Sequence, residues 1–151
     1  MNGIPNELTI ERRMAVPRDA VWRAWTEHAT EWFCPLPWKA PEVEMDLRPG
    51  GISRVRMVGP EGEEMNLTGV ILEVVPGERV VSTDAIAPGW VPQTAFMISV
   101  TEFIADGDGT LYRASARHWT DEARQQHEAM GFHEGWGKVA EQLEAVARRI
   151  A

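Results

Sequence analysis

The C-terminal segment, residues 120–151, constrains the fold more than any other stretch because it has the pattern of one long amphipathic helix. Thr120 and Asp121 offer N-cap oxygens at its start, and Arg148 stands in its last turn, where the helix dipole favours a cation. Apolar residues recur at spacings of three and four and form one stripe: Phe132, Trp136, Val139, Leu143, Val146 and Ile150. The charged residues fall mostly off this stripe: Glu134, Lys138, Glu141, Glu144 and Arg148. Such a stripe is stable only when it is buried, so the rest of the chain must supply a surface that covers it.

Three glycines interrupt the N-terminal half of this segment: Gly131, Gly135 and Gly137. Each costs about 1 kcal/mol relative to alanine inside a helix. Their presence predicts that something there needs room, which is another backbone, a large side chain or a ligand.

The composition is that of one globular domain with an acidic balance. At 151 residues, 44% of them hydrophobic and 25% charged, the chain has the size of a single domain spanning residues 1–151. Its net charge of −8 argues against nucleic acid and anionic membranes as partners, since both need a basic surface. Cys34 is the one cysteine, and residues 1–11 lack the apolar stretch of a signal peptide. We therefore expect a cytoplasmic protein.

Ahead of the C-terminal segment, the chain has the pattern of a strand, a helical region and a run of hairpins. Residues 8–14 alternate as in a strand, and Pro17 opens a helix at its first turn. The proline- and tryptophan-rich residues 32–41 predict a loop that closes over something. Six further strands follow, joined by turns rich in glycine and proline. An antiparallel sheet of about seven strands must cover one face, and the C-terminal helix is the only element long enough to do so.

Strand alternation predicts which side chains face that helix. The predicted inward set is Val43, Met45, Val55, Met57, Asn66, Thr68, Val70, Leu72, Val74, Val80, Ser82, Asp84, Phe96, Ile98, Val100, Tyr112, Ala114, Ala116 and His118. Ser99, Thr101 and Arg113 fall on the opposite face. A single unnoticed bulge would reverse such an assignment for the rest of its strand.

Several motifs resemble one known family. They are PRDAVWRAW at 17–25, EMDLRPGG at 44–51, LTGV at 67–70 with EVVP at 73–76, and MGFHEGW at 130–136. In this order they are similar to the Hsp90-ATPase-activator-homologue branch of the START-like (SRPBCC) superfamily. The resemblance implies an α+β helix-grip fold in the order β-α-α-β6-α, in which a curved antiparallel sheet wraps around the long C-terminal helix and encloses a hydrophobic cavity.

The same resemblance suggests three functions. Superfamily members bind lipids, sterols, polyketides or plant hormones, so the leading hypothesis is binding of a small hydrophobic or aromatic molecule in the cavity, without a cofactor. The second is an enzyme of cyclase or hydrolase type, acting on a polyketide-like or aromatic substrate with His118 and Asp84 in acid–base roles. The third is a protein-interaction module of the Hsp90 co-chaperone type, for which the acidic outer face is the supporting feature. The family also makes a homodimer possible.

The predicted cavity combines an apolar wall with a few polar anchors. Its expected residues are Trp38, Met45, Met57, Asn66, Thr68, Val70, Asp84, Trp90, Phe96, Ile98, Tyr112, His118 and Met130. Trp38 and Trp90 are expected near the mouth, and Asn66, Thr68 and Asp84 as the anchors. The alternative for the acid–base pair is that His118 is a hydrogen-bonded wall residue and that Asp84 ends its strand in solvent.

The sequence pattern around two histidines and the cysteine indicates neither a metal site nor a nucleophile. His127 and His133 are six residues apart, which turns them roughly 120° from one another on a helix, so we expect no metal site. His127 is then either at the cavity mouth or on the surface. Cys34 has no basic neighbour in sequence, which argues against a nucleophilic role.

Overall fold

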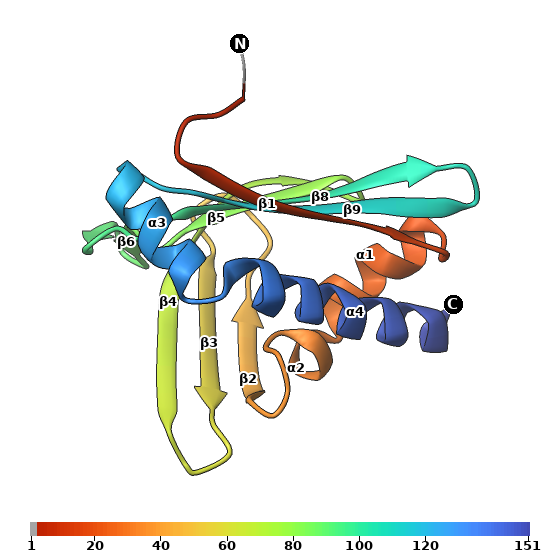
Figure 1. Cartoon of the computed structure of the whole chain (residues 1–151), viewed down its shortest axis with the longest axis horizontal. Coiled ribbons are helices and arrows are strands. Elements are labelled where there is room, and N and C mark those ends of the chain that lie inside the picture. Colours follow the sequence, from red (N-terminus) through yellow and green to blue (C-terminus); the bar gives the residue numbers. More distant parts are fainter. Residues whose placement is uncertain (1–2) are drawn as a thin grey trace.

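The computed structural model describes residues 3–151 as an α+β protein built on a seven-stranded sheet. Residues 1 and 2, which the single-domain prediction includes, lie outside this description. In chain order the elements are β1 Glu7–Met14, α1 Arg18–Glu27, α2 Ala29–Trp32, β2 Lys39–Met45, β3 Ile52–Val58, β4 Glu64–Val75, β5 Arg79–Thr83, β6 Ile86–Ala87, β7 Val91–Pro92, β8 Ile98–Asp106, β9 Gly109–Arg117, α3 Asp121–Ala129 and α4 Phe132–Ile150 (Figure 1).

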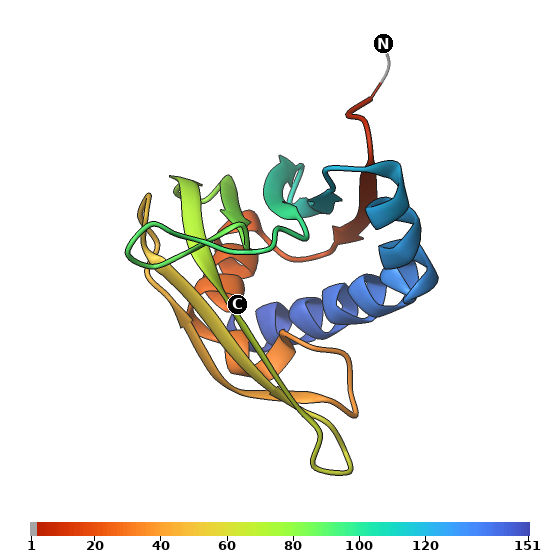
Figure 2. The same cartoon turned by 90° about the vertical axis from the view of Figure 1, so that its left-hand side faces the viewer.

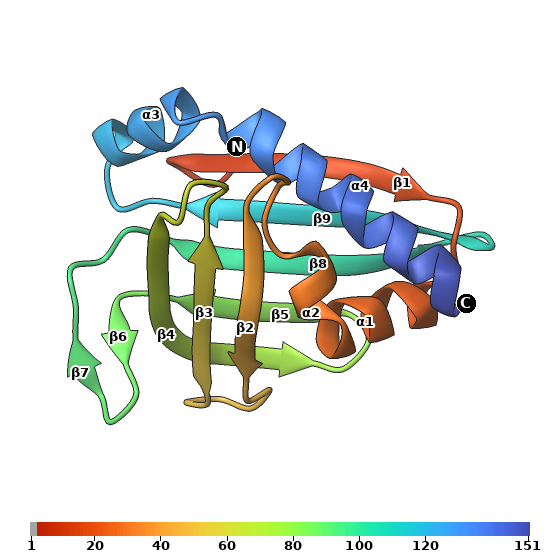
Figure 3. The same ribbon diagram turned by 90° about the horizontal axis from the view of Figure 1, so that it is seen from below.

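The main sheet is antiparallel throughout, with the strand order β1-β9-β8-β5-β4-β3-β2. Figure 3 shows β2, β3 and the first part of β4 running across the direction of β5, β8 and β9, because β4 bends midway. The sheet is therefore curled, and α4 lies along its concave side, as Figure 2 also shows. The predicted helix-grip fold is confirmed. The short strands β6 and β7 form a separate hairpin, whereas the proline- and glycine-containing residues 87–93 predict an exposed loop.

The prediction of one long C-terminal helix is wrong, because the segment forms two helices. Thr120 caps α3 through its side-chain oxygen, which accepts a hydrogen bond from the backbone N–H of Ala123 at 3.1 Å. The break falls at Gly131, whose φ of 92° is left-handed and suits glycine far better than any other residue. This glycine therefore serves a change of direction between α3 and α4.

The core fills the space between the helices and one half of the sheet. Ala20, Val21, Ala24 and Trp25 recur at helical spacing and form the buried face of α1. Trp25 stacks on Trp32 with ring centroids 5.5 Å apart. Trp32, predicted in a loop, instead ends α2 and is buried, and its Nε1–H donates to the carbonyl of Ala24 at 2.9 Å.

An ion pair between a buried carboxylate and a partly exposed arginine joins β1 to α4. Arg12, the polar residue on the apolar side of β1, donates from Nε to Oε1 of Glu144 at 2.7 Å. The other carboxylate oxygen of Glu144 accepts from the Ala15 N–H at 3.2 Å and from Arg148 at 2.9 Å. Burial by itself raises the pKa of Glu144, but these hydrogen bonds outweigh it and hold the pKa below its usual value. The expectation that Glu144 lies off the buried stripe is therefore wrong.

Two registers contradict the predicted sheet faces. A bulge between Ile71 and Glu73 shifts β4, so that Ile71 faces α4, whereas the predicted Leu72 is exposed. Before the bulge, the pairing of β4 with β3 sets Asn66 opposite Arg56 on the outer face. By the same pairing Thr68 and Val70, opposite Arg54 and Ile52, also lie on the outer face, although Thr68 still borders the cavity. The inward predictions for these two residues and for Asn66 and Leu72 are therefore wrong.

The second register is that of β8. Ile98 pairs with Arg117, and Thr101 pairs with Ala114, which lines the concave side. Ser99 and Thr101 therefore face inward, while Ile98 and Val100 face outward, which reverses the prediction. The β2–β3 hairpin keeps its predicted faces, but its strand pairing is shifted by two residues, because the sequence pattern predicts Glu44 opposite Arg56. On its outer face Glu44 pairs with Arg54.

Candidate functional site

A cavity of about 450 Å³ lies between the concave side of the sheet and the α3–α4 segment. Apolar side chains dominate its wall. The sheet contributes Met45, Val55, Met57, Met65, Leu67 and Ile71, and the helical side contributes Met130, Phe132, Gly135, Trp136 and Val139. Hydroxyl groups come from Ser53, Ser82, Ser99, Thr101 and Tyr112. An apolar pocket of this size with scattered polar groups is typical of small-molecule sites.

The structure brings together part of the predicted cavity set. The predicted residues that line the cavity are Met45, Met57, Thr68, Asp84, Phe96, Tyr112 and Met130. Those that do not line it are Trp38, Asn66, Val70, Trp90, Ile98 and His118.

The two tryptophans expected at the mouth lie elsewhere. Trp38 borders a neighbouring pocket of about 410 Å³, together with Cys34 and Gln142. Trp90 is 71% exposed, and its ring lies against Gly50 in the turn before β3. Loop aromatics were expected to close the pocket, but this loop folds over a turn of the sheet instead.

Gly135 faces the cavity from the first turn of α4. A Cβ atom built on it meets no atom within 4 Å outside the neighbouring helix backbone, and the same holds for Gly137, which does not line the cavity. The room predicted beside these glycines is therefore open space at Gly135 and not a closely packed backbone.

His127 lines the cavity, which agrees with the first of the two positions expected for it, the cavity mouth or the surface. In a continuous helix, nine residues would turn it about 180° away from Trp136. The break at Gly131 instead brings the His127 ring to 5.7 Å from the Trp136 ring and to 5.1 Å from the Phe132 ring, centroid to centroid. Gly131, which suits a helix end far better than a helix interior, was the signal that could have predicted this break.

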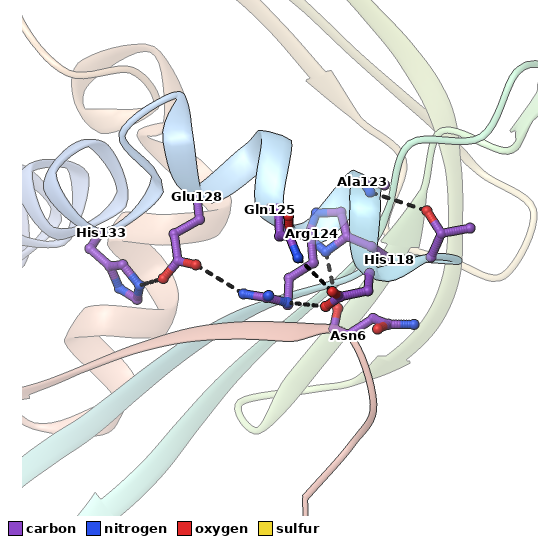
Figure 4. Close-up of polar contacts among 9 residues, drawn as sticks. Asn6, His118, Ala123, Arg124, Gln125, Glu128 and His133 are labelled. Atoms are coloured by element: carbon purple, nitrogen blue, oxygen red, sulfur yellow. Dashed lines mark hydrogen bonds and ion pairs between the residues drawn. The ribbon is translucent and has the colours of Figure 1, made fainter.

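His127 and His118 form a hydrogen-bonded pair, in which His127 lines the cavity and His118 does not. Nε2 of His118 lies 2.9 Å from Nδ1 of His127, and Nδ1 of His118 lies 3.1 Å from the carbonyl oxygen of Asn6. Figure 4 shows His118 beside Asn6 below α3. Both rings are buried. Burial lowers the pKa of His127 to about 4, and the neighbouring His118 adds to this effect.

A chain of polar contacts runs along α3 and reaches the start of α4. Arg124 donates to Asp121 and to Glu128, both at 2.9 Å, and Glu128 lies 3.2 Å from Nε2 of His133 (Figure 4). The last contact crosses the break, because Glu128 belongs to α3 and His133 to α4. His133 therefore links α4 to α3 through its contact with Glu128.

Asp84 acts on the backbone at the edge of the cavity. Its Oδ1 accepts from the N–H groups of Phe96 at 2.9 Å and Met97 at 3.1 Å, which fixes the segment that leads into β8. Within residues 3–151, Asp84 makes no hydrogen bond to His118, and both ring nitrogens of His118 are engaged by other groups. The predicted acid–base pair is not assembled.

Cys34 and Tyr112 are two further reactive side chains that line the cavity. Burial raises the pKa of the Cys34 thiol and that of the Tyr112 phenol, so both stay protonated at neutral pH. Within the described part of the chain, no three His, Cys, Asp or Glu side chains are grouped so as to hold a metal ion.

The buried neutral His127 predicts a loss of stability in mild acid. The unfolded chain protonates this histidine near its ordinary pKa of 6.5, whereas the folded chain does so only near a pKa of about 4. The contribution is thus complete above pH 6.5 and falls as the pH drops toward 4, by on the order of 2 to 3 kcal/mol. In His127→Gln, which can still donate to His118 but does not titrate, urea unfolding at several pH values should show a shallower decline. Equal pH slopes would contradict the assignment.

The sequence matches the family model "Activator of Hsp90 ATPase homolog 1-like protein" over residues 15–148. The chain belongs to this family. A structure of a protein from Nitrosomonas europaea is similar over the whole fold, with 38% identity, coverage of 97% of each chain and a TM-score of 0.92. A Mycobacterium smegmatis protein shares 27% identity, with 93% of this chain and 89% of that chain covered and a TM-score of 0.77.

A more distant AHSA1-like protein from Aeromonas hydrophila shares the fold, with 18% identity, coverage of 95% and 93% of the two chains and a TM-score of 0.72. No curated protein matches the sequence. Membership of this START-like family supports a ligand-binding type of domain. Among the described residues, no helix combines the length and the apolar character needed to cross a membrane.

Proposed function

We propose that this AHSA1-like protein binds a small hydrophobic or aromatic molecule in the cavity between the sheet and α4. The observation that carries the proposal is a cavity of about 450 Å³ with a mainly apolar wall, within the volume range of small-molecule sites. The methionines of this wall adapt their shape readily to different ligands. Gly135 supports the proposal further, because the helix keeps a costly glycine where a side chain would enter the open space.

The two other hypotheses receive no specific support from the geometry. The enzyme hypothesis needs His118 to exchange protons with a ligand, but both of its ring nitrogens bond to the protein. The co-chaperone hypothesis relied on an acidic outer face, yet outer carboxylates such as Glu44 and Glu11 are paired with Arg54 and Arg113.

Two matched glycine variants test where the ligand binds. In Gly135→Leu the new side chain enters the cavity, so the affinity for the neutral fluorophore N-phenylnaphthylamine should fall at least about tenfold. In Gly137→Leu the new side chain starts from a backbone position that is equally free of neighbours but lies outside the cavity wall. The affinity of Gly137→Leu for the fluorophore should stay within about twofold of the wild-type affinity in a fluorescence titration. Equal weakening in both variants, or in neither, would contradict the proposed location.

A further inference from the structure

The polar groups of the cavity wall include no cation. Its ionisable side chains are Cys34, Asp84, Tyr112 and His127, and no lysine or arginine is found among the residues that line it within the described chain. A ligand carboxylate or phosphate would lose its hydration there without gaining a counter-ion, and Asp84 would repel it. The wall therefore selects against anions.

The carbonyl of Asn6 determines where the protons of the histidine pair lie. A carbonyl oxygen can only accept, so Nδ1 of His118 must carry the proton that reaches Asn6. Both rings are more than nine-tenths buried, and no carboxylate is among their hydrogen-bond partners in residues 3–151, which favours two uncharged rings. Nε2 of a neutral His118 is then bare and accepts the proton on Nδ1 of His127.

The consequence is that Nε2 of His127 carries no proton. Within residues 3–151 no protein atom hydrogen-bonds to it, and this part of the chain has no side-chain nitrogen or oxygen that is both sealed from solvent and unpartnered. Nε2 is therefore not sealed from open space, and His127 is among the residues that line the cavity. It offers the cavity a neutral hydrogen-bond acceptor.

Aromatic rings surround this acceptor. The centroid of Phe96 lies 4.8 Å from that of His127, and Phe132 and Trp136 approach the ring edge-on. A flat apolar molecule with one hydrogen-bond donor matches such a patch, because aromatic rings pack well against one another while the donor satisfies the nitrogen.

We propose that the cavity takes an uncharged aromatic ligand whose hydroxyl group donates a hydrogen bond to Nε2 of His127, and that His118 is the positioning residue that fixes the His127 tautomer. This inference rests on the proposed ligand-binding function and names the chemical class of its ligand. Burial of His127, which lowers its pKa to about 4, keeps this acceptor in place at neutral pH.

Three probes of one shape test the hydroxyl requirement. At pH 7, calorimetric titration should show β-naphthol binding about 3- to 10-fold tighter than its methyl ether, which lacks the donor. β-Naphthoate, an anion, should bind at least about tenfold more weakly than β-naphthol. In His127→Phe, the affinity for β-naphthol should drop to that for the ether, while the ether keeps its own affinity within about twofold.

A second measurement needs no variant and no ligand. Long-range proton–nitrogen NMR of the wild-type protein should show both histidines protonated on Nδ1 and bare on Nε2. In His118→Phe, which leaves Nδ1 of His127 without its acceptor, the His127 tautomer should become mixed and the preference for β-naphthol over the ether should shrink.

The outcomes separate the two proposals. Failure of all three probes to bind would contradict the proposed function and this inference with it. Binding of β-naphthol and its ether with equal affinity, tighter binding of β-naphthoate, or a proton on Nε2 of His127 would overturn the hydroxyl inference and leave ligand binding in the cavity intact.

Discussion

Glu144→Ala is expected to lower the free energy of unfolding by about 3 kcal/mol, at the lower end of the range for breaking a buried ion pair. The carboxylate is 7% exposed and holds Arg12 and the Ala15 N–H, so its removal leaves both without their acceptor. The Arg12 side chain is 41% exposed, and water can replace part of what it loses. Urea unfolding measures this change in free energy. In thermal unfolding the Tm should fall by about 6–12 °C for a chain of this size.

The matched control is Glu141→Ala, one turn earlier on the exposed side of the same helix. This variant removes a carboxylate of the same kind from a solvent-facing position. It should change the free energy of unfolding by no more than about 0.5 kcal/mol. If the two variants unfolded at the same urea concentration, the ion pair would not be what joins β1 to α4.

Gly69→Ala is expected to have a still larger effect, because no neighbouring group can move aside. A Cβ atom on Gly69 would lie 2.1 Å from the carbonyl oxygen of Thr83 and 3.2 Å from Cα of Asp84. Both are backbone atoms at the bend of β4, where this strand meets β5. Relief of the overlap would require the strands to separate, at a cost of at least about 4 kcal/mol.

Expression in soluble form, followed by thermal unfolding, checks this prediction. We expect either an insoluble product or a Tm lowered by at least about 8 °C. The control Gly137→Ala introduces the same methyl group into open space and should leave the Tm unchanged or slightly higher, because alanine favours the helix. A Gly69→Ala protein with the wild-type Tm would contradict the close approach of β4 and β5.

Much of the fold could be predicted from sequence, because periodicity and turn residues are local signals. The buried stripe that includes Leu143 and Val146 and the β2–β3 hairpin follow such signals, and both appear in the structure, although the pairing of the hairpin is shifted by two residues from the predicted one. The break at Gly131 was missed because its glycine was interpreted, together with Gly135 and Gly137, as a source of room inside one helix and not as the signal of a helix end. Glu144 was misplaced because a buried charge depends on a partner 132 residues away, Arg12.

The site was harder to predict than the fold. Strand parity depends on register, and the bulge after Ile71 left Val70 and Leu72 outside the cavity. His127 reaches the cavity only because α3 changes direction, so no local pattern around it predicts its role. Met45 and Met57, by contrast, lie on regular strands without a bulge between them and the β2–β3 turn, and they line the cavity as predicted.

Native mass spectrometry of the purified protein, before and after incubation with a mixed set of phenols, sterols, flavonoids and polyketides, tests most directly whether the cavity is a ligand site. We expect a retained or acquired small molecule at one copy per chain, lost in Gly135→Leu and kept in Gly137→Leu. A protein that carries no adduct with any of these classes, or an adduct that survives in Gly135→Leu, would contradict it.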